Sequence, residues 1–311
     1  MNWSGVMPAV TTAFHKQMEV DHLFMAQHAR WLLENGCSGL VMLGSLGEGA
    51  TLEVFEKTAI LKNIIGAVQG KAPVVAAISA LSTASAVHLA KEAEQAGCEA
   101  LMVLPPYVYA TDWREMKAHV SAVIAATPLS CMLYNNPIAY KTDFLPQQIV
   151  ELAGEHPNFQ AVKESAADVR RITAIRSLLA ARLAVFVGVD DMIVEAAAAG
   201  AAGWIAGLAN AFPAESVRLF DLAMAGKAEE AFALYRWFLP LLRMDTVPKF
   251  VQLIKWVQAQ AGIGSPAVRA PRMELAGAEL AEAQEVLAAA MKTRPEVPEV
   301  SFASLAGAVS S

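Results

Sequence analysis

Cysteine is scarce in this chain. Only Cys37, Cys98 and Cys131 occur among 311 residues, and no two of them form a C-x-x-C pair. This scatter argues against a disulfide framework or a thiolate zinc site and is typical of small core residues in a reducing compartment. The N-terminal segment also lacks the basic and apolar regions of a secretory signal, so we expect a cytoplasmic protein.

Charge is also sparse. Charged residues make up 17% of the chain, the formal net charge is -6, and no block of lysine and arginine stands out. Nothing therefore indicates nucleic acid or an anionic membrane as a partner. The hydrophobic content of 55% excludes a disordered chain and fits strands that helices bury on both faces.

One uncharged stretch, residues 196–214, is about as long as a membrane-spanning helix. It reads AAAAGAAGWIAGLANAFPA, is rich in glycine and alanine, and is broken by Asn210 and Pro213. We therefore expect a helix end followed by a buried strand and a loop.

Eight short apolar runs of strand length recur along the chain, near residues 6, 39, 73, 100, 130, 159, 183 and 203. Between them lie segments of helical period, such as DHLFMAQHARWLLENG, which begins at a capping Asp21, carries Leu23 on its apolar stripe and ends at Gly36. Strands that alternate with helices pair in parallel through right-handed crossovers. The count of eight favours a closed (β/α)8 TIM barrel, an α/β fold, over an open sheet.

The pattern divides the chain into three parts. Residues 1–225 hold the predicted barrel, and residues 226–293 read only as helices that form a C-terminal helical appendage. From residue 294 to 311 the periodicity fades into Pro, Ser, Ala and Gly, which predicts a loose tail.

A glycine-rich loop, GSLGEG, follows the second predicted strand and so lies at the C-terminal mouth of the barrel. Its G-x-x-G-x-G spacing matches neither a dinucleotide loop nor a Walker loop. Inward-pointing N–H groups at Gly44 and Gly47, with the Ser45 hydroxyl, suit a small anion such as a carboxylate. A tight strand-to-helix turn explains the loop equally well when it is considered alone.

Two further strand ends favour a catalytic site. Lys163 ends the sixth strand after an apolar run, where burial lowers the pKa of an ammonium and yields an amine nucleophile. Tyr134 ends the fifth strand and offers a phenol for proton transfer. The alternatives are a surface lysine paired with Glu164 and a tyrosine ring packed under the rim, but the three features together outweigh them.

The motifs GSLGEG, YNNP, VKES, GVDD and GWIAG together resemble the dihydrodipicolinate synthase / N-acetylneuraminate lyase family over residues 3–290. The resemblance implies a (β/α)8 barrel, usually a homotetramer or otherwise a homodimer, in which a lysine forms a Schiff base with a 2-oxo acid. It implies neither a metal nor a separate cofactor.

The resemblance also implies roles for individual residues. Lys163 corresponds to the Schiff-base lysine, Tyr134 to the proton-transfer phenol, and Ser45 to a hydroxyl that acts on the substrate carboxylate. The corresponding substrate-binding residues are Gly44, Leu46, Gly47, Asn136, Gly188 and Ile205.

Three departures from the synthase pattern bear on the substrate. Leu46 stands where a second threonine is usual, and Ala139 stands where an arginine clamps a second carboxylate. A relay tyrosine supplied to the neighbouring subunit aligns with Val108, although Tyr107 or Tyr109 is close enough in sequence to replace it.

The motifs WIAGLANAFP, VQLIKW and GIGSPAVRAPR are most similar to a branch that contains 1-pyrroline-4-hydroxy-2-carboxylate deaminases. We therefore expect a deaminase or dehydratase acting on that cyclic imine. The alternatives are dihydrodipicolinate synthesis from pyruvate and aspartate semialdehyde, another pyruvate-dependent aldolase or dehydratase of sugar acids, and a non-catalytic 2-oxo acid binder.

Other polar residues indicate less chemistry. Asp190 and Asp191 suggest a metal, but neighbouring strand residues point to opposite faces, so an aspartate that stabilises the rim is the stronger reading. Glu48 is predicted to order the glycine loop through backbone hydrogen bonds. The six histidines show neither triad nor ligand spacing.

Overall fold

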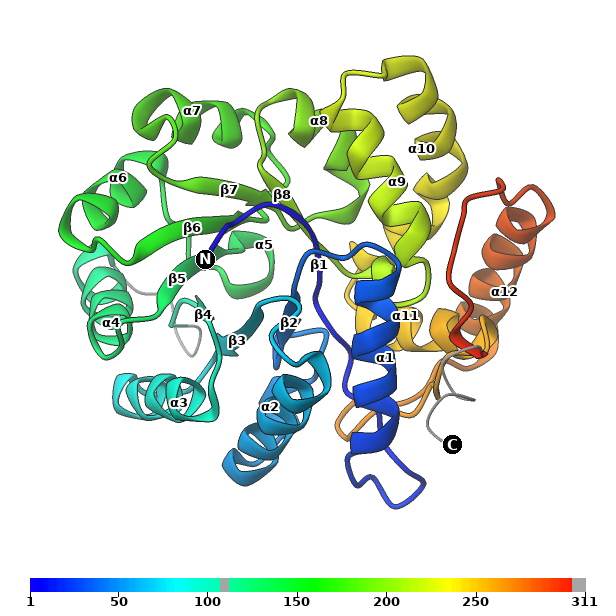
Figure 1. Ribbon diagram of the computed structural model, residues 1–311, viewed down its shortest axis with the longest axis horizontal. Helices are drawn as coiled ribbons and strands as arrows, with labels where there is room; N and C mark the ends of the chain where they lie inside the picture. The colour runs from blue at the N-terminus through cyan, green and yellow to red at the C-terminus, as the bar shows by residue number, and fades with distance from the viewer. Residues whose placement is uncertain (107–111, 304–311) are drawn as a thin grey trace.

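The computed structural model describes residues 1–106 and 112–303, in which eight strands form one parallel sheet (Figure 1). The strands are β1 (Gly5–Pro8), β2 (Leu40–Met42), β3 (Val74–Ile78), β4 (Ala100–Val103), β5 (Ser130–Asn135), β6 (Phe159–Glu164), β7 (Ala184–Val187) and β8 (Gly203–Ala206). Each predicted apolar run contains one of them. The runs are apolar throughout because helices cover one side of every strand and the barrel interior covers the other.

The sheet closes on itself. Its order is β1-β8-β7-β6-β5-β4-β3-β2, and the ends meet where Val10 N–H donates to the Val41 carbonyl at 2.9 Å. A parallel bridge between Ala9 and Val41 accompanies that bond. The predicted (β/α)8 barrel is therefore confirmed, and the C-terminal strand ends meet at one mouth.

Helices surround the barrel, as Figure 1 shows. The covering helices are α1 (His22–Glu34), α2 (Val54–Val68), α3 (Thr83–Ala96), α4 (Trp113–Ala125), α6 (Pro146–Glu155), α7 (Arg170–Leu179), α8 (Ile193–Ala198) and α9 (Pro213–Met224). The C-terminal helices are α10 (Ala228–Leu242), α11 (Phe250–Gln260) and α12 (Gly277–Lys292). Short turns at the strand ends and after α10 are α5 (Pro137–Tyr140), η1 (Gly49–Thr51), η2 (Asp190–Met192), η3 (Leu208–Asn210) and η4 (Arg243–Asp245).

Helix α1 begins and ends where its sequence predicts. The Asp21 side chain accepts a backbone N–H of the first turn, and Gly36 adopts a φ of +92° just past the last turn. The predicted apolar stripe is wrong at Leu23, which is 65% exposed. His28 and Trp31 are buried instead, because a distant segment of the chain packs on that side of the helix.

That segment is the start of the predicted loose tail. The Val300 carbonyl accepts the Trp31 indole N–H at 2.6 Å, and the ring of Phe302 lies 5.5 Å from that of Trp31. Arg294 pairs with the buried Glu215 at 2.6 Å. Residues 294–303 are thus held to the barrel by a few side chains that follow no periodic pattern in the sequence. The rest of the predicted tail, residues 304–311, lies outside the described residues.

The uncharged stretch 196–214 contains the end of α8, then β8, η3 and the start of α9, as its glycines and Pro213 predict. In the part of the chain that the structure describes, no helix is both long and apolar enough to cross a membrane.

Candidate active site

Lys163 and Tyr134 lie side by side at the barrel mouth. Pairing of β5 with β6 places the two residues in register, and the Lys163 Nζ lies 4.0 Å from the centre of the Tyr134 ring. The lysine side chain is buried at 6% exposure. Gly188, which follows β7, borders it so closely that a Cβ there would lie 2.2 Å from the Lys163 Cε. Only glycine leaves room for the lysine, so Gly188, expected to bind substrate, is in direct contact with the predicted nucleophile.

Glu164 is not the partner of Lys163. Its carboxylate accepts hydrogen bonds from the Asn135 side chain at 3.1 and 3.3 Å and from Ala166 N–H at 2.8 Å. Successive residues of a strand point to opposite faces, so Glu164 is directed away from the lysine. The alternative of a solvated Lys163–Glu164 pair is therefore excluded.

Burial controls the protonation of both predicted catalytic groups. It lowers the pKa of Lys163 to about 8, against the opposing effect of the Asp245 and Asp190 carboxyls. It raises the pKa of Tyr134 to about 12, and Asp245 acts in the same direction. Near neutral pH a usable fraction of the amine is therefore unprotonated while the phenol keeps its proton, which suits a nucleophile beside a proton donor.

Asp190 stabilises the rim. Its carboxylate accepts the Trp204 indole N–H at 2.9 Å and the N–H groups of Gly207 and Leu208 at 2.9 to 3.1 Å. This confirms the rim reading of the Asp190-Asp191 pair. Among residues 1–106 and 112–303, no group of three or more His, Cys, Asp or Glu is arranged to hold a metal ion.

The glycine loop presents unused donors at the mouth. Within the described residues, the N–H groups of Ser45, Leu46 and Gly47 donate to no protein acceptor, which leaves them available to a carboxylate. Gly47 also serves the turn itself, because a Cβ there would lie 2.7 Å from the Val10 carbonyl oxygen. The tight-turn reading therefore holds at Gly47, and carboxylate binding by the loop stays a prediction.

A second tyrosine joins the site from the same chain. The Tyr140 hydroxyl is hydrogen bonded to the Ser45 hydroxyl, and its ring lies edge-on to Tyr134 at 5.8 Å. Asn136, expected to bind substrate, donates to the Tyr134 hydroxyl at 3.0 Å and accepts the Ala139 N–H at 3.0 Å, so it caps α5. The paired hydroxyl groups of Ser45 and Tyr140 thus lie on the side of the site where the Tyr140 ring meets that of Tyr134.

Glu48 orders the loop through backbone hydrogen bonds, as predicted, and also through its side chain. Its N–H donates to the Ser45 carbonyl at 3.1 Å, and its carbonyl accepts the Thr51 N–H at 2.8 Å. The carboxylate is fully buried, accepts the Lys255 ammonium at 2.8 Å and accepts the Arg269 N–H at 2.9 Å. Lys255 donates in addition to the Thr12 carbonyl at 2.8 Å. Helix α11 therefore fixes the position of the glycine loop through the Lys255–Glu48 ion pair.

The remaining predicted residues are less informative. Gly44 follows β2 in the loop, and Ile205 is buried on β8 beside Met7 of β1. The position of the missing relay tyrosine, Val108, and its neighbours Tyr107 and Tyr109 lie outside the described residues.

Sequence reasoning missed three site residues: Tyr140, Asp245 and Lys255. Asp245 and Lys255 belong to the C-terminal helical region, which carries no strand-end signal. Tyr140 had a weak signal, since it lies only six positions beyond Tyr134 in YNNPIAY. No periodicity identifies a residue that reaches the mouth from outside the barrel.

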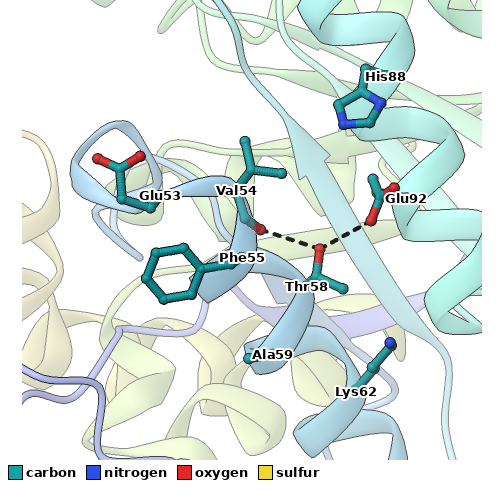
Figure 2. A pocket seen from close by; sticks show the side chains of 8 residues that line it. All are labelled: Glu53, Val54, Phe55, Thr58, Ala59, Lys62, His88 and Glu92. Atoms are coloured by element: carbon teal, nitrogen blue, oxygen red, sulfur yellow. Dashed lines mark hydrogen bonds between the residues drawn. The ribbon is translucent and has the colours of Figure 1, made fainter.

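A shallow groove between α2 and α3 lies elsewhere on the surface. Figure 2 shows its lining side chains, with Thr58 hydrogen bonded to Val54 and Glu92. Phe55 beside it is 73% exposed. The groove contains none of the predicted catalytic residues, so the chemistry belongs at the barrel mouth.

Comparison with known proteins agrees with this geometry. Residues 2–290 match the family described as Dihydrodipicolinate synthetase family. The 4-hydroxy-tetrahydrodipicolinate synthase of Desulforamulus reducens is 28% identical over 287 residues, which cover 92% of this chain and 97% of that protein. The enzyme of the same name from Cellvibrio japonicus is 31% identical over 271 residues, 87% of this chain and 93% of its own.

A solved structure shares the fold. The 4-hydroxy-tetrahydrodipicolinate synthase from Methylacidiphilum fumariolicum SolV superposes with a TM-score of 0.90 at 25% identity. The match covers 94% of this chain and 97% of that one, so the similarity extends through the C-terminal helices.

Proposed function

This chain belongs to the dihydrodipicolinate synthetase family, and we propose that it is the member that deaminates and dehydrates 1-pyrroline-4-hydroxy-2-carboxylate. Enzymes of this family are lyases that bind their substrate covalently on a lysine and use no external cofactor. The chain is therefore an enzyme of the Schiff-base aldolase type, which sets aside the reading as a non-catalytic binder.

Lys163 is the proposed nucleophile. Its amine adds to C2 of the cyclic imine, and the ring C2–N1 bond breaks as the departing nitrogen takes a proton from Tyr134. The resulting iminium draws electrons from C3, so the Tyr134 phenolate removes a C3 proton and an enamine forms. Ser45 and the free N–H groups of the glycine loop hold the carboxylate.

The observation that carries the choice of substrate is that the charged groups acting on Lys163 within the described residues include no second cation. Both charged groups that act on its amine, Asp245 and Asp190, are carboxyls. Ala139, in the position of the synthase arginine, is exposed and brings no guanidinium. A second substrate carboxylate would therefore find no cationic clamp, whereas the pyrroline carries a single carboxylate for the glycine loop.

A second candidate is 4-hydroxy-tetrahydrodipicolinate synthesis from pyruvate and aspartate semialdehyde. It is favoured by the names of the relatives, which match over most of their length. The same Lys163 would then form the iminium with pyruvate. The sugar acid aldolases and dehydratases use the same amine and differ in preferring hydroxylated straight-chain 2-oxo acids.

Steady-state turnover separates these candidates. The purified enzyme is expected to release ammonia and 2-oxoglutarate semialdehyde from the pyrroline. It is expected to condense pyruvate with aspartate semialdehyde at least about 100-fold less efficiently, because Ala139 supplies no charged hydrogen-bond donor to bind the second carboxylate. Efficient condensation with no ammonia release would establish the synthase instead. Preference for a straight-chain sugar acid would assign the third candidate.

The pH dependence of iminium formation tests the environment of Lys163. Because burial lowers the lysine pKa to about 8, the rate of pyruvate adduct formation at subsaturating pyruvate should rise with pH and level off above that value. Borohydride quenching followed by intact mass measures this rate. An inflection near pH 10 would show a solvated lysine and contradict the assignment.

The assembly stays a prediction. We propose the homotetramer or homodimer that the family resemblance implies, and sedimentation of the purified enzyme measures it.

A further inference from the structure

Asp245 reaches the barrel mouth from the C-terminal helical region. It ends η4, just beyond α10, and its carboxyl lies over Gly207, the residue that follows β8. A Cβ at Gly207 would fall 2.1 Å from one Asp245 carboxyl oxygen and 3.0 Å from the other. The absence of a side chain at Gly207 is therefore what allows this carboxyl into the site.

The carboxyl stands among the reacting groups. Asp245 acts electrostatically on both Lys163 and Tyr134, and it is the stronger of the two acidic influences on the lysine. The contact with Gly207 at the end of β8 and these charge interactions together place Asp245 at the mouth, within electrostatic reach of the amine and the phenol.

Asp245 differs from its neighbour Asp190 in its hydrogen bonds. Asp190 is occupied by donors from Trp204, Gly207 and Leu208. In residues 1–106 and 112–303, no group donates a hydrogen bond to Asp245, although it is half-buried. The Asp245 carboxyl thus has no structural hydrogen bond to give up and is available to a ligand, unlike that of Asp190.

The surroundings of Asp245 favour its protonated form. Burial raises its pKa well above the usual range, the Asp190 charge raises it further, and Lys163 opposes the shift. When Lys163 is present as the neutral amine, this opposition weakens. The carboxyl then carries a proton that it is able to donate.

We propose that Asp245 is the acid that protonates the C4 hydroxyl of the enamine as it departs, an inference that rests on the proposed function. The C4–O bond breaks with its electron pair on oxygen, the Asp245 proton joins it to form water, and the enamine nitrogen supplies the electrons for the new C3–C4 double bond. Asp245 is left as a carboxylate and regains a proton from C5, and Tyr134 returns the proton it took from C3 to C3 of the resulting dienamine. The remaining C4–C5 enamine then shifts a proton from its nitrogen to C4 and becomes the C5 imine. Hydrolysis of that imine releases ammonia, and hydrolysis of the lysine iminium releases the semialdehyde.

The test compares two leaving groups. Asp245→Asn keeps the size of the side chain and removes the acid, so kcat for the 4-hydroxy pyrroline should fall by about 10² to 10⁴-fold. The 4-fluoro pyrroline loses fluoride, which departs without a proton. Fluoride release in a single turnover, which precedes the proton transfer from C5, should therefore stay within about threefold of wild type.

The matched control is Asp221→Asn. It removes an exposed carboxyl from α9, away from the strand ends that carry the reacting groups. This variant should process both substrates at nearly the wild-type rate. Trapping of the iminium by borohydride in Asp245→Asn should also persist, which shows that the fold and Lys163 are intact.

Each failure has its own signature. Wild-type enzyme that releases no ammonia from the hydroxy pyrroline overturns the proposed function itself. Active wild type with an Asp245→Asn variant that slows both substrates equally, or neither, overturns the acid role and leaves the proposed function in place.

Discussion

Replacement of Lys163 by alanine is expected to lower turnover by at least about 10⁴-fold and to abolish the borohydride-reducible adduct. The Lys163 amine is the group that we assign to attack C2. Because it is buried against Tyr134 and Gly188, a fraction of it is unprotonated near neutral pH. Peptide mass spectrometry after reduction with pyruvate locates the adduct, and a substrate panel led by the pyrroline measures turnover.

Two variants make this test specific. Lys163→Arg keeps the charge but offers no usable nucleophile, because guanidinium does not deprotonate in proteins. It should be as inactive as the alanine variant. Lys62→Ala removes an exposed lysine of α2 and should behave as wild type. An adduct that persists in Lys163→Ala would remove this residue from the mechanism.

Replacement of Glu48 by glutamine is expected to destabilise the fold by roughly 3–5 kcal/mol, since it leaves a buried cation without its charge partner. Glu48 is fully buried and Lys255 is 2% exposed, and the two lie 2.8 Å apart. The backbone at Glu48 also adopts a left-handed φ of +53°, which its side-chain contacts help to hold. Loss of the pair should release the glycine loop and raise KM for the substrate carboxylate.

Urea unfolding measures the loss of stability, and kinetics with the folded fraction measures KM. The double variant Glu48→Gln, Lys255→Met should recover much of the stability, because no fully buried ion remains unpaired and Arg272, 3.9 Å from Glu48, is partly exposed. Glu279→Gln breaks the exposed Lys249–Glu279 pair and should leave the midpoint unchanged. A small effect of Glu48→Gln, equal to that control, would contradict the anchoring role.

Much of the barrel was predictable because its determinants are local. Each strand is an apolar run, and each helix has its own period and ends, as with Asp21 and Gly36 around α1. Lys163 and Tyr134 were predictable for the same reason. Each ends an apolar run, and in a parallel barrel all such ends meet at one mouth.

Other features depend on contacts between segments far apart in the sequence. His28 and Trp31 are buried, and Leu23 is not, because distant segments pack on their side of α1. Phe302 lies against both rings, and the Asn210 carbonyl is hydrogen bonded to His28. Glu48 gave no sign in sequence of its partner Lys255, since a buried ion pair is defined by two side chains that only packing brings together.

The amino-acid sequence by itself determined that this chain forms a closed parallel barrel with an amine and a phenol at its mouth. The spacing of apolar residues and the residue that ends each strand are both properties of short segments of the chain. Only the tertiary structure decided which further groups reach that mouth. Asp245 is there because Gly207 has no side chain, and Tyr140 is there because α5 turns its ring toward Tyr134. Such neighbours arise when separate elements pack together, and no local pattern encodes that packing.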